Sequence, residues 1–331
     1  MLTRRNFVAG AVAGAATLPL ACPALSQNVV EIRVAHVNQT TFQGHAPMVA
    51  ATEKITARTN GRLVFGIFPG AQLGTTTEMV EKASRGEPII TYTDAAYMAS
   101  FGVPELSILG GPFLIDNIDQ GFKLHDSDLI AGWYQRLAEG AGIRVLALNW
   151  FGGARHVVGK AAYPEPSDLK GVKIRVPPVE TWRKTFEPLG AIPTTVEAAE
   201  TYSALSQGVV DAAESPILSL ESNLWTEAAP HVTLTAHFEL FTGWAMSGAT
   251  FDALSDAEKA IVVEEFRGAG VASSRDAASK IAAARGRMEA KGITFTEANI
   301  PAYREATASF YTSFPQWPAG LFEAVRAAAT T

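Results

Sequence analysis

Segments typical of strands alternate with segments typical of helices along most of this 331-residue chain, and this alternation constrains the fold more than any other feature. Residues 30–36 alternate between apolar and polar side chains, as a half-buried strand does, and a helix is expected at 45–58. The same order recurs, with strands at residues 63–68, 87–91 and 144–150 and helices at 75–84 and 118–139. Such alternation is typical of an α/β domain, in which helices cover the faces of a sheet.

The alternation starts again in the second half of the chain. There we expect strands at residues 173–176 and 209–212 and helices at 179–187, 197–207 and 216–226. No Ser- or Gly-rich linker separates the two sets, and the length suits two domains of roughly 100–200 residues each. We therefore expect two α/β lobes connected by crossing strands, with a cleft and a hinge between them.

Residues 255–291 predict one unusually long helix. Ser255 is a suitable N-cap and Glu258 completes a capping box, after which no proline interrupts the segment. At about 1.5 Å per residue such a helix would be roughly 55 Å long, more than the width of one small domain. We expect it to pack on both lobes, with a kink at Gly268 and Gly270. The C-terminal residues 301–329 are expected to form helices that pack on the second lobe.

The N-terminus has the features of an export signal. Arg4 and Arg5 precede a mildly apolar stretch that is rich in Ala and Gly and ends in small residues. This order is typical of a cleaved twin-arginine signal peptide, here residues 1–27, and directs the mature protein to the periplasm. The alternatives are a membrane anchor, which the prolines within the stretch disfavour, and lipid attachment at Cys22. Cleavage would leave a chain without cysteine, and 27 basic residues less these two arginines, against 33 acidic ones, give a net charge of −8.

Composition excludes several classes of function. A net charge of −6 disfavours a nucleic-acid surface, because phosphate binding needs clustered Lys and Arg. The chain has one cysteine, so it has neither an internal disulfide nor a multi-cysteine metal site, and none of its six histidines is paired at metal-ligand spacing. Dinucleotide, P-loop, zinc-protease and serine-hydrolase motifs are absent, and Ser167 is a better helix cap than a nucleophile. We therefore predict no catalytic residue, no cofactor and no metal.

Two arginines stand where an α/β fold binds its ligands. Arg175 lies at the end of the strand expected at 173–176, and Arg155 follows the strand expected to end at residue 150. Ligands of open α/β sheets bind beyond the carboxyl ends of the strands. A guanidinium can hold a carboxylate through two parallel hydrogen bonds, which an ammonium group cannot do. Both arginines are therefore candidate binding groups for an organic acid.

Several ordered motifs resemble one known family. They are GRLVFGIFPGAQLG at 61–74, GPFL at 111–114, DLKGVKIRVP at 168–177, ETYSALSQGVVD at 200–211 and LTAH at 234–237. From about residue 30 to 310 the chain resembles the solute-binding proteins of tripartite ATP-independent periplasmic (TRAP) transporters, of the dicarboxylate-binding type. The resemblance implies a type II-like periplasmic binding-protein fold, in which two lobes close over an organic acid and a long helix spans both. It also implies delivery of the acid to the permease subunits of a TRAP transporter.

The resemblance further implies how the chain is divided. Lobe I would comprise residues 28–152 and about 241–280, and lobe II residues 153–240 and about 281–331. These boundaries follow the expected crossing of the chain between the lobes.

The resemblance also assigns roles to residues. Arg175 matches the arginine that clamps the ligand carboxylate, and Arg155 matches a second arginine that many members use. Ser215 stands where members commonly carry an asparagine, so one amide donor is missing there. Three more positions match residues around the ligand, namely Asn38 in the first lobe and Glu197 and Ala198 at the cleft edge.

Aromatic residues at or just beyond the predicted strand ends are further candidates for the cleft wall. They are Phe42, Tyr92, Trp150, Phe151, Phe241 and Trp244, and each could instead be a core residue. Asp94 could accept a hydrogen bond from a ligand hydroxyl or cap the turn that follows it. Together these residues favour a monocarboxylate, aromatic or hydroxylated, over a C4-dicarboxylate.

Other classes of protein remain as alternatives at this level. A solute receptor of an ABC importer or of a sensor kinase would share the two-lobe shape, although the 168–177 motif favours the TRAP type. A secreted hydrolase lacks a nucleophile–base pair. We expect a monomer, with a small organic acid and a membrane permease as its partners and no nucleic acid.

Overall fold

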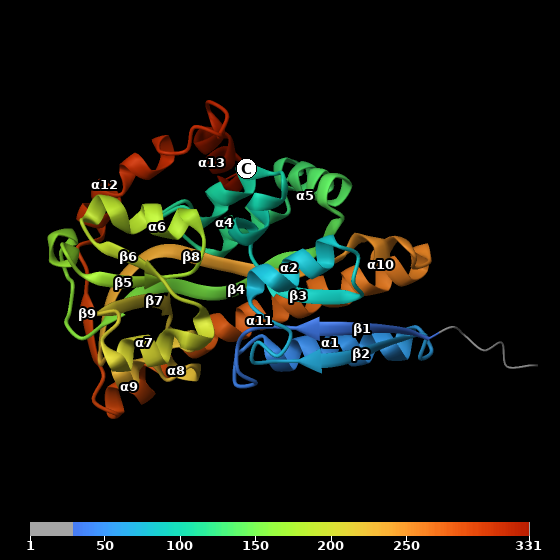
Figure 1. The fold of residues 1–331 in the computed structure, drawn as a ribbon, viewed down its shortest axis with the longest axis horizontal. Helices are drawn as coiled ribbons and strands as arrows, with labels where there is room; N and C mark the ends of the chain where they lie inside the picture. Colours follow the sequence, from blue (N-terminus) through green and yellow to red (C-terminus); the bar gives the residue numbers. More distant parts are fainter. Residues whose placement is uncertain (1–28, 331) are drawn as a thin grey trace, which may run out of the picture.

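The structure, a computed structural model, describes residues 29–330 (Figure 1). The predicted signal peptide and Cys22 lie outside these residues. The strands are β1 (Val30–Ala35), β2 (Leu63–Phe68), β3 (Ile89–Thr93), β4 (Ile143–Gly159), β5 (Lys173–Val176), β6 (Ile192–Thr195), β7 (Ala212–Pro216), β8 (His231–Ser247) and β9 (Thr294–Glu297). The helices are α1 (His45–Arg58), α2 (Thr76–Ser84), α3 (Ala95–Met98), α4 (Ile118–His125), α5 (Asp128–Ala141), α6 (Glu180–Phe186), α7 (Thr201–Gln207), α8 (Ile217–Ser222), α9 (Trp225–Ala228), α10 (Gly248–Asp252), α11 (Asp256–Ala290), α12 (Ile300–Ala306) and α13 (Leu321–Thr330). Short 3-10 helices lie at Ala99–Phe101, Pro104–Gly110, Pro166–Leu169, Glu187–Leu189, Ala198–Glu200 and Ala308–Thr312.

Within the described residues, nine strands form one mixed sheet in the order β2-β1-β3-β8-β4-β7-β5-β6, with β9 added along β8. β4 and β8 each have 17 residues and pair antiparallel along their whole length. β3 pairs with one end of β8, and β7 pairs with the opposite end of β4. The sheet therefore extends through two lobes of the molecule. The first lobe contains β1, β2 and β3, and the second contains β5, β6 and β7 (Figure 1). The predicted α/β two-lobe fold with crossing strands is confirmed.

The long helix α11 connects the cores of the two lobes. It has 35 residues, and Ser255 and Glu258 form the predicted capping box at its start. Val262 and Phe266 pack in the first lobe's core, whereas Ala284 packs in a cluster with residues of the second lobe. The sequence predicts this helix correctly because its cap and its uninterrupted helix-forming residues are local signals.

α11 is also hydrogen-bonded to β4 where that strand passes from one lobe to the other. The Ser274 hydroxyl donates to the backbone oxygen of Asn149 (2.8 Å) and accepts from the backbone N–H of Phe151 (2.7 Å). The indole N–H of Trp150 donates to the backbone oxygen of Phe266 (3.2 Å). These contacts fix the helix to the strand at the junction of the lobes.

Several predicted elements differ in their bounds. The helix expected at 216–226 is two helices, α8 and α9, and the strand expected at 209–212 is β7, which begins only at Ala212. The helix expected at 118–139 is two helices, because Ser127 adopts an extended conformation and caps α5 through the N–H of Ile130. The strand expected to end at residue 150 continues to Gly159. Gly153 has φ +104° and lies at a register shift, so the glycine pair produces a bulge instead of ending the strand. β8 shows no strand pattern in the sequence, because its residues are buried on both faces of the sheet and alternate little.

The C-terminal helix α13 packs on the first lobe, so the expectation that it packs on the second lobe is wrong. Its residues Leu321, Val325 and Ala329 lie in the core cluster that contains Ile130 and Leu137 of α5. The reason is that α13 presents an apolar face that matches the helical layer formed by α4 and α5. The segment before it crosses from α12, which packs on the second lobe.

Candidate functional site

A cavity of about 100 Å³ lies between the lobes. The first lobe contributes Val37, Asn38, Phe42, Thr76, Tyr92, Thr93, Asp94, Tyr97 and Thr242 to its wall. The second lobe contributes Arg155, Arg175, Pro177, Trp182, Ala198, Ser215, Ser219, Asn223, Trp225 and Leu240. Many of these residues follow the ends of β1, β3 and β5, where an α/β sheet binds its ligands.

Arg175 is a buried cation in the wall of this cavity. It is the third residue of β5 and is 2% exposed. Its Nε donates to the backbone oxygen of Val196 (2.8 Å), and its guanidinium lies 5.5 Å from the centre of the Trp225 ring. No carboxylate of residues 29–330 lies within 4.0 Å of it. Burial lowers the pKa of Arg175 to about 10, although nearby Tyr97 and Glu214 oppose this shift.

A buried charge without a partner costs several kcal/mol, unless an opposite charge joins it. Arg175 makes no hydrogen bond through Nη1 or Nη2 to the part of the chain that the structure describes. Two parallel donors are the arrangement that a carboxylate accepts from arginine. The cavity at Arg175 is therefore suited to an anion.

Arg155 is in a different electrostatic situation, because Glu214 neutralises it. Both carboxylate oxygens of Glu214 accept from Arg155, and Nη2 of the arginine is 2.6 Å from Oε1. Nη2 also donates to the backbone oxygen of Glu214 (2.9 Å). The Arg155 guanidinium lies 5.4 Å from the centre of the Trp182 ring. Arg155 can offer hydrogen bonds to a ligand, but it brings little uncompensated charge.

Glu214 is fully buried between Arg155 and a histidine. Nε2 of His237 lies 3.4 Å from Oε2 of Glu214, and Nδ1 of His237 lies 2.8 Å from the Thr235 hydroxyl. Burial by itself would raise the pKa of Glu214, but the charge of Arg155 and the nearby His237 lower it further than burial raises it. Glu214 is therefore ionised at neutral pH, as the counter-charge of Arg155 requires.

The first lobe supplies an acidic group to the same cavity. Asp94 caps α3 and accepts hydrogen bonds from the backbone N–H groups of Ala96 (2.8 Å) and Tyr97 (3.3 Å). Burial raises the pKa of Asp94 to about 6, and those two hydrogen bonds only partly oppose the rise. Asp94 therefore loses its negative charge around pH 6, within the interlobe cavity.

Tyr92 has a fixed orientation at the cavity wall. Its hydroxyl lies 2.6 Å from the hydroxyl of Thr242, and Thr242 donates to the backbone oxygen of Trp150 (2.9 Å). Since the Thr242 proton is used in that bond, Tyr92 is the donor in the first pair. Tyr92 also packs edge-on against Phe42, with ring centres 5.0 Å apart.

The structure brings eight of the twelve predicted ligand contacts to the cavity and places four elsewhere. The eight are Asn38, Phe42, Tyr92, Asp94, Arg155, Arg175, Ala198 and Ser215. Glu197 is half-buried beside the 3-10 helix of Ala198–Glu200 and does not line the cavity, and burial raises its pKa. Trp150, Phe241 and Trp244 are core residues, and so is Phe151.

The four aromatic residues that were expected at the cleft wall lie in the core for one physical reason. A residue at a strand end can face a cleft, but β4 and β8 run through both lobes, so these rings lie within the strands. Trp150 and Trp244 are covered by Phe266 of α11 on one face of the sheet. Phe241 contacts Phe122 and Phe151 on the other face.

Sequence reasoning missed several wall residues. Trp182 and Trp225 stack on Arg155 and Arg175, and Tyr97 follows Asp94 by three residues. Trp182 could have been expected, because it lies in the helix that follows the strand with Arg175. Trp225 follows Leu224, whose φ of +58° turns the chain in a way that no local pattern predicts.

In residues 29–330, no three or more His, Cys, Asp or Glu side chains are grouped so that they could hold a metal ion. No helix of this part of the chain is both long enough and apolar enough to cross a membrane.

The family of this chain follows from a comparison with known proteins. The model of the family described as "Bacterial extracellular solute-binding protein, family 7" matches residues 34–316. The chain belongs to this family. Members of family 7 are solute-binding receptors, as the resemblance found in the sequence implied.

Solved structures of TRAP periplasmic solute-binding proteins share the fold over nearly the whole chain. A TRAP periplasmic solute-binding protein from Actinobacillus succinogenes 130Z, with bound L-galactonate, has a TM-score of 0.87 and 28% identity and covers 91% of this chain and 99% of its own. A similar protein from Ochrobacterium anthropi, with bound L-fuconate, has a TM-score of 0.87 and 29% identity, with the same coverage of both chains. Among sequence relatives, the C4-dicarboxylate-binding periplasmic protein DctP of Rhodobacter capsulatus is 28% identical over 242 residues, which are 72% of this chain and 70% of that protein.

Proposed function

We propose that this family 7 protein is a periplasmic receptor that binds a hydroxylated monocarboxylate in the interlobe cavity and delivers it to a TRAP-type permease. The observation that carries the proposal is Arg175, a buried guanidinium in the cavity wall without a carboxylate partner among the described residues. The carboxylate of the ligand would supply that missing partner.

The charges around the cavity favour a monoanion over a dianion. Arg155 and Glu214 balance each other, so Arg175 is the cation left for the ligand. Asp94 lies in the same wall, and with a pKa of about 6 it is largely ionised at neutral pH. A second carboxylate would meet Asp94 without a second free cation to compensate it, which disfavours a C4-dicarboxylate such as the one named for the Rhodobacter relative.

The rest of the cavity wall supports a hydroxylated ligand. Hydroxyl and amide groups dominate the first lobe's side and the edge near α8, among them Thr76, Thr93, Ser219 and Asn223. Such groups hydrogen-bond ligand hydroxyls, and unsatisfied ones would penalise an apolar ligand. The solved relatives with bound L-galactonate and L-fuconate contain ligands of this class.

A thermal-shift panel tests the proposal. We expect the mature protein to be stabilised by sugar acids such as L-galactonate, L-fuconate and D-gluconate, because a ligand that binds the native state raises the melting temperature. Succinate, neutral sugars and amino acids are expected to give no shift. Stabilisation by succinate alone would overturn the monoanion assignment, and stabilisation by amino acids or neutral sugars alone would overturn the organic-acid assignment.

We also propose the division into lobes and the route of export. The first lobe comprises residues 28–152 and about 241–280 and includes α13, and the second comprises 153–240 and the segment from about 281 to α12. The packing of α13 with α5 supports this change from the sequence-based boundaries. Cleavage of the signal after about residue 27 is expected, and N-terminal sequencing of protein from the periplasm would test it.

The receptor role is preferred over the alternatives on the basis of the family. The matched family and the TRAP proteins among the solved relatives support a secondary transporter over an ABC importer or a sensor kinase. Co-purification with a permease encoded beside the gene would distinguish these partners. The receptor is proposed to act without catalysis, and release of the acid unchanged after binding would test that point.

A further inference from the structure

The ligand cavity between the lobes adjoins a second cavity, of about 250 Å³, which we call the outer cavity. The residues that line both cavities are Val37, Asn38, Ala198, Asn223 and Trp225. The outer cavity adds Gln39, Ala199, Tyr202, Ser222 and Leu224. The ligand cavity, of about 100 Å³, is small for a ligand site, which typically measures about 300–1,000 Å³. The two cavities together reach this range.

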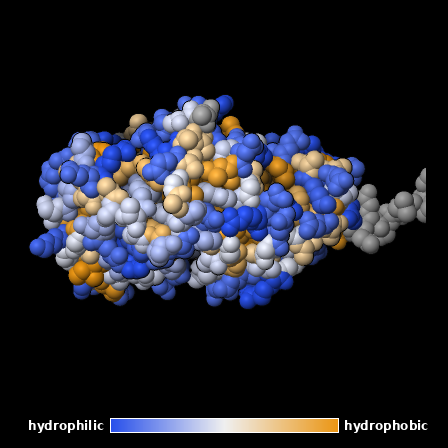
Figure 2. Space-filling view, turned by 90° about the horizontal axis from the view of Figure 1, so that it is seen from above, coloured by the Kyte–Doolittle hydropathy of each residue, from blue (hydrophilic) through white to orange (hydrophobic). Residues whose placement is uncertain are grey.

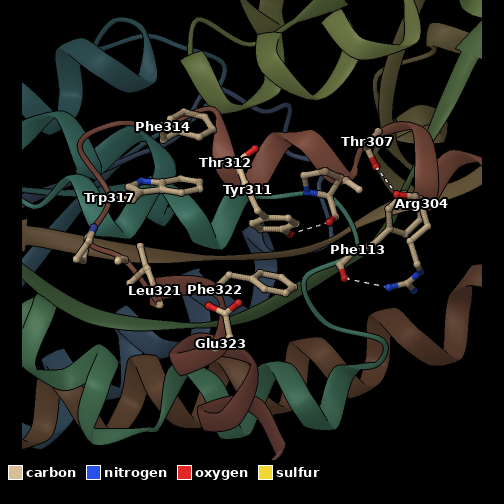
Figure 3. A pocket seen from close by; sticks show the side chains of 15 residues that line it. Phe113, Arg304, Thr307, Tyr311, Thr312, Phe314, Trp317, Leu321, Phe322 and Glu323 are labelled. Carbon is tan, nitrogen blue, oxygen red and sulfur yellow. Dashed lines mark hydrogen bonds between the residues drawn. The ribbon is translucent and has the colours of Figure 1, made fainter.

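Other cavities share less of their wall with the ligand cavity. A cavity beside α6 has only Tyr97 in common with it. A larger one, of about 590 Å³, is lined by Tyr311, Trp317 and Phe322 of the C-terminal segment and shares no residue with the ligand cavity (Figure 3). In the view from above, hydrophobic residues gather in patches among hydrophilic ones (Figure 2). A ligand held at Arg175 is therefore expected to extend into the outer cavity.

Both lobes form the outer cavity. Val37, Asn38 and Gln39 follow the end of β1 in the first lobe, and the other wall residues lie around α7, α8 and α9 in the second. The lobes also touch beside this cavity, where the Thr41 hydroxyl donates to the backbone oxygen of Ser222 (3.5 Å). An occupant of the outer cavity would therefore contact both lobes.

The wall of the outer cavity is polar but uncharged. None of its ten residues carries a formal charge at neutral pH. The amides of Asn38 and Gln39 and the hydroxyl of Tyr202 make no hydrogen bond to residues 29–330. Glu200 follows the wall residue Ala199 in the chain, so a second anionic group would be repelled there. Free amide and hydroxyl groups without a charge suit a neutral group with several hydroxyls.

Two exposed apolar side chains complete this wall. Tyr202 is 41% exposed and Leu224 is 47% exposed. Leu224 has φ +58°, and residues held in such strained conformations cluster at ligand sites. A sugar ring has an apolar C–H face, which packs on side chains of this kind, and hydroxyls at its edge, which reach the amides.

We propose that the outer cavity holds a neutral sugar residue joined to the acid at Arg175, so that the ligand is a glycosylated sugar acid. The sugar residue would pack on Tyr202 and Leu224 and form hydrogen bonds with Asn38 and Gln39. This inference rests on the proposed function, because the acid end of the ligand must bind at Arg175.

Isothermal titration with D-gluconate and lactobionate tests the outer cavity, because lactobionate is gluconate with a galactosyl group attached. We expect lactobionate to bind roughly tenfold more tightly than gluconate, from the added hydrogen bonds less the cost of ordering the sugar. Ala199→Trp places a large ring into the outer cavity from an exposed position that does not line the ligand cavity. It should remove the tenfold advantage of lactobionate and leave gluconate unchanged.

Ser203→Trp is the matched control, because Ser203 is exposed nearby in α7 but lies outside both walls. It should leave the binding of both acids unchanged. Tyr202→Ala should weaken lactobionate about fivefold and leave gluconate unchanged.

The outcomes separate this inference from the proposed function. Gluconate binding without any gain for lactobionate, or an equal loss of both acids in Ala199→Trp, would overturn the outer cavity as a sugar site and leave the receptor role intact. Binding of neither acid to the wild-type protein would overturn the proposed sugar-acid receptor and this inference with it.

Discussion

At the scale of single residues, two arginines that look alike in the sequence have different roles in the structure. Arg155 is held by a buried carboxylate, whereas Arg175 has none within reach in the described chain. The difference arises from Glu214, which precedes the predicted contact Ser215 by one residue and which sequence reasoning did not single out. We therefore propose that Arg155 contributes orientation and hydrogen bonds, and that Arg175 contributes the charge that selects an anion.

Replacement of Arg175 is expected to abolish tight binding of the acid. Arg175→Ala leaves the ligand carboxylate buried without a cation, at a cost of roughly 3–5 kcal/mol, or about two to four decades in affinity. Arg175→Lys keeps the charge but loses the paired donors, so its affinity for the acid should lie between that of wild type and that of Arg175→Ala. Isothermal titration of the three proteins measures these differences. An Arg175→Ala protein that binds within threefold of wild type would show that the carboxylate lies elsewhere.

Asp94 predicts how affinity depends on pH. Its pKa of about 6 means that it loses its negative charge as the pH falls from 7.5 to 5, while the ligand carboxylate stays ionised. Because Asp94 and Arg175 line the same cavity, loss of this negative charge would remove a repulsion of roughly 1–2 kcal/mol on the ligand carboxylate, so affinity should rise roughly tenfold over this range. The pKa of Glu214 is lowered and that of His237 is also lowered, so neither reverses the trend.

Asp94→Asn provides the matched control for this pH dependence. Asparagine also caps helices well, so α3 should keep its start. Affinity of the variant is expected to be nearly constant between pH 7.5 and 5 and to equal or exceed that of wild type at pH 7.5. A wild-type profile without a rise, or the same rise in the variant, would show that Asp94 is not the titrating group.

At the scale of elements, the long helix α11 is fixed to β4 at one close contact. A Cβ atom on Gly270 would lie 2.1 Å from Oδ1 of Asn149 and 2.7 Å from Nε1 of Trp150. Gly268, two residues earlier in the same helix, has nothing within 4 Å of such an atom. Gly270 thus allows close packing at the lobe junction, whereas Gly268 does not contribute to it. The sequence-based expectation treated the two glycines alike, as sites of a kink.

Two alanine substitutions should have opposite effects on stability. Gly268→Ala should raise the free energy of unfolding by roughly 0.5–1 kcal/mol, because alanine favours a helix and meets no neighbour. Gly270→Ala should lower it by roughly 1–3 kcal/mol, because the added methyl group forces α11 away from β4. Urea unfolding of both variants measures the difference. Equal stabilisation by both substitutions would show that α11 does not approach β4 so closely.

The elements that the sequence predicts best are those with local signals. α1, β2 and α11 follow from periodicity, strand-forming residues and caps, and Arg175 follows from its position at the end of a short strand. β8 and the second half of β4 escape prediction because burial on both faces removes the alternation and a bulge at Gly153 mimics an end. The placement of Trp150, Phe241 and Trp244 in the core depends on those two strands, so it could not be deduced either.

At the scale of the whole molecule, the ligand cavity is built from both lobes. Asn38 and Asp94 come from the first lobe, and Arg155 and Arg175 come from the second. We propose that an acid bound at Arg175 reaches groups of both lobes and holds them together, and that the lobes move about the connection formed by β4, β8 and α11. The central claim is that the carboxylate at Arg175 draws the lobes together.

Distance measurements between spin labels on the two lobes test this claim most directly. The mature chain is expected to contain no cysteine, so labels can be placed only at the exposed positions Glu53→Cys in α1 and Gln207→Cys in α7. With wild-type Arg175, adding the acid identified in the panel should shorten the mean distance between the labels. In Arg175→Ala, the same acid should leave it unchanged. An unchanged distance in the first protein despite measured binding, or an equal shortening in both, would contradict the account.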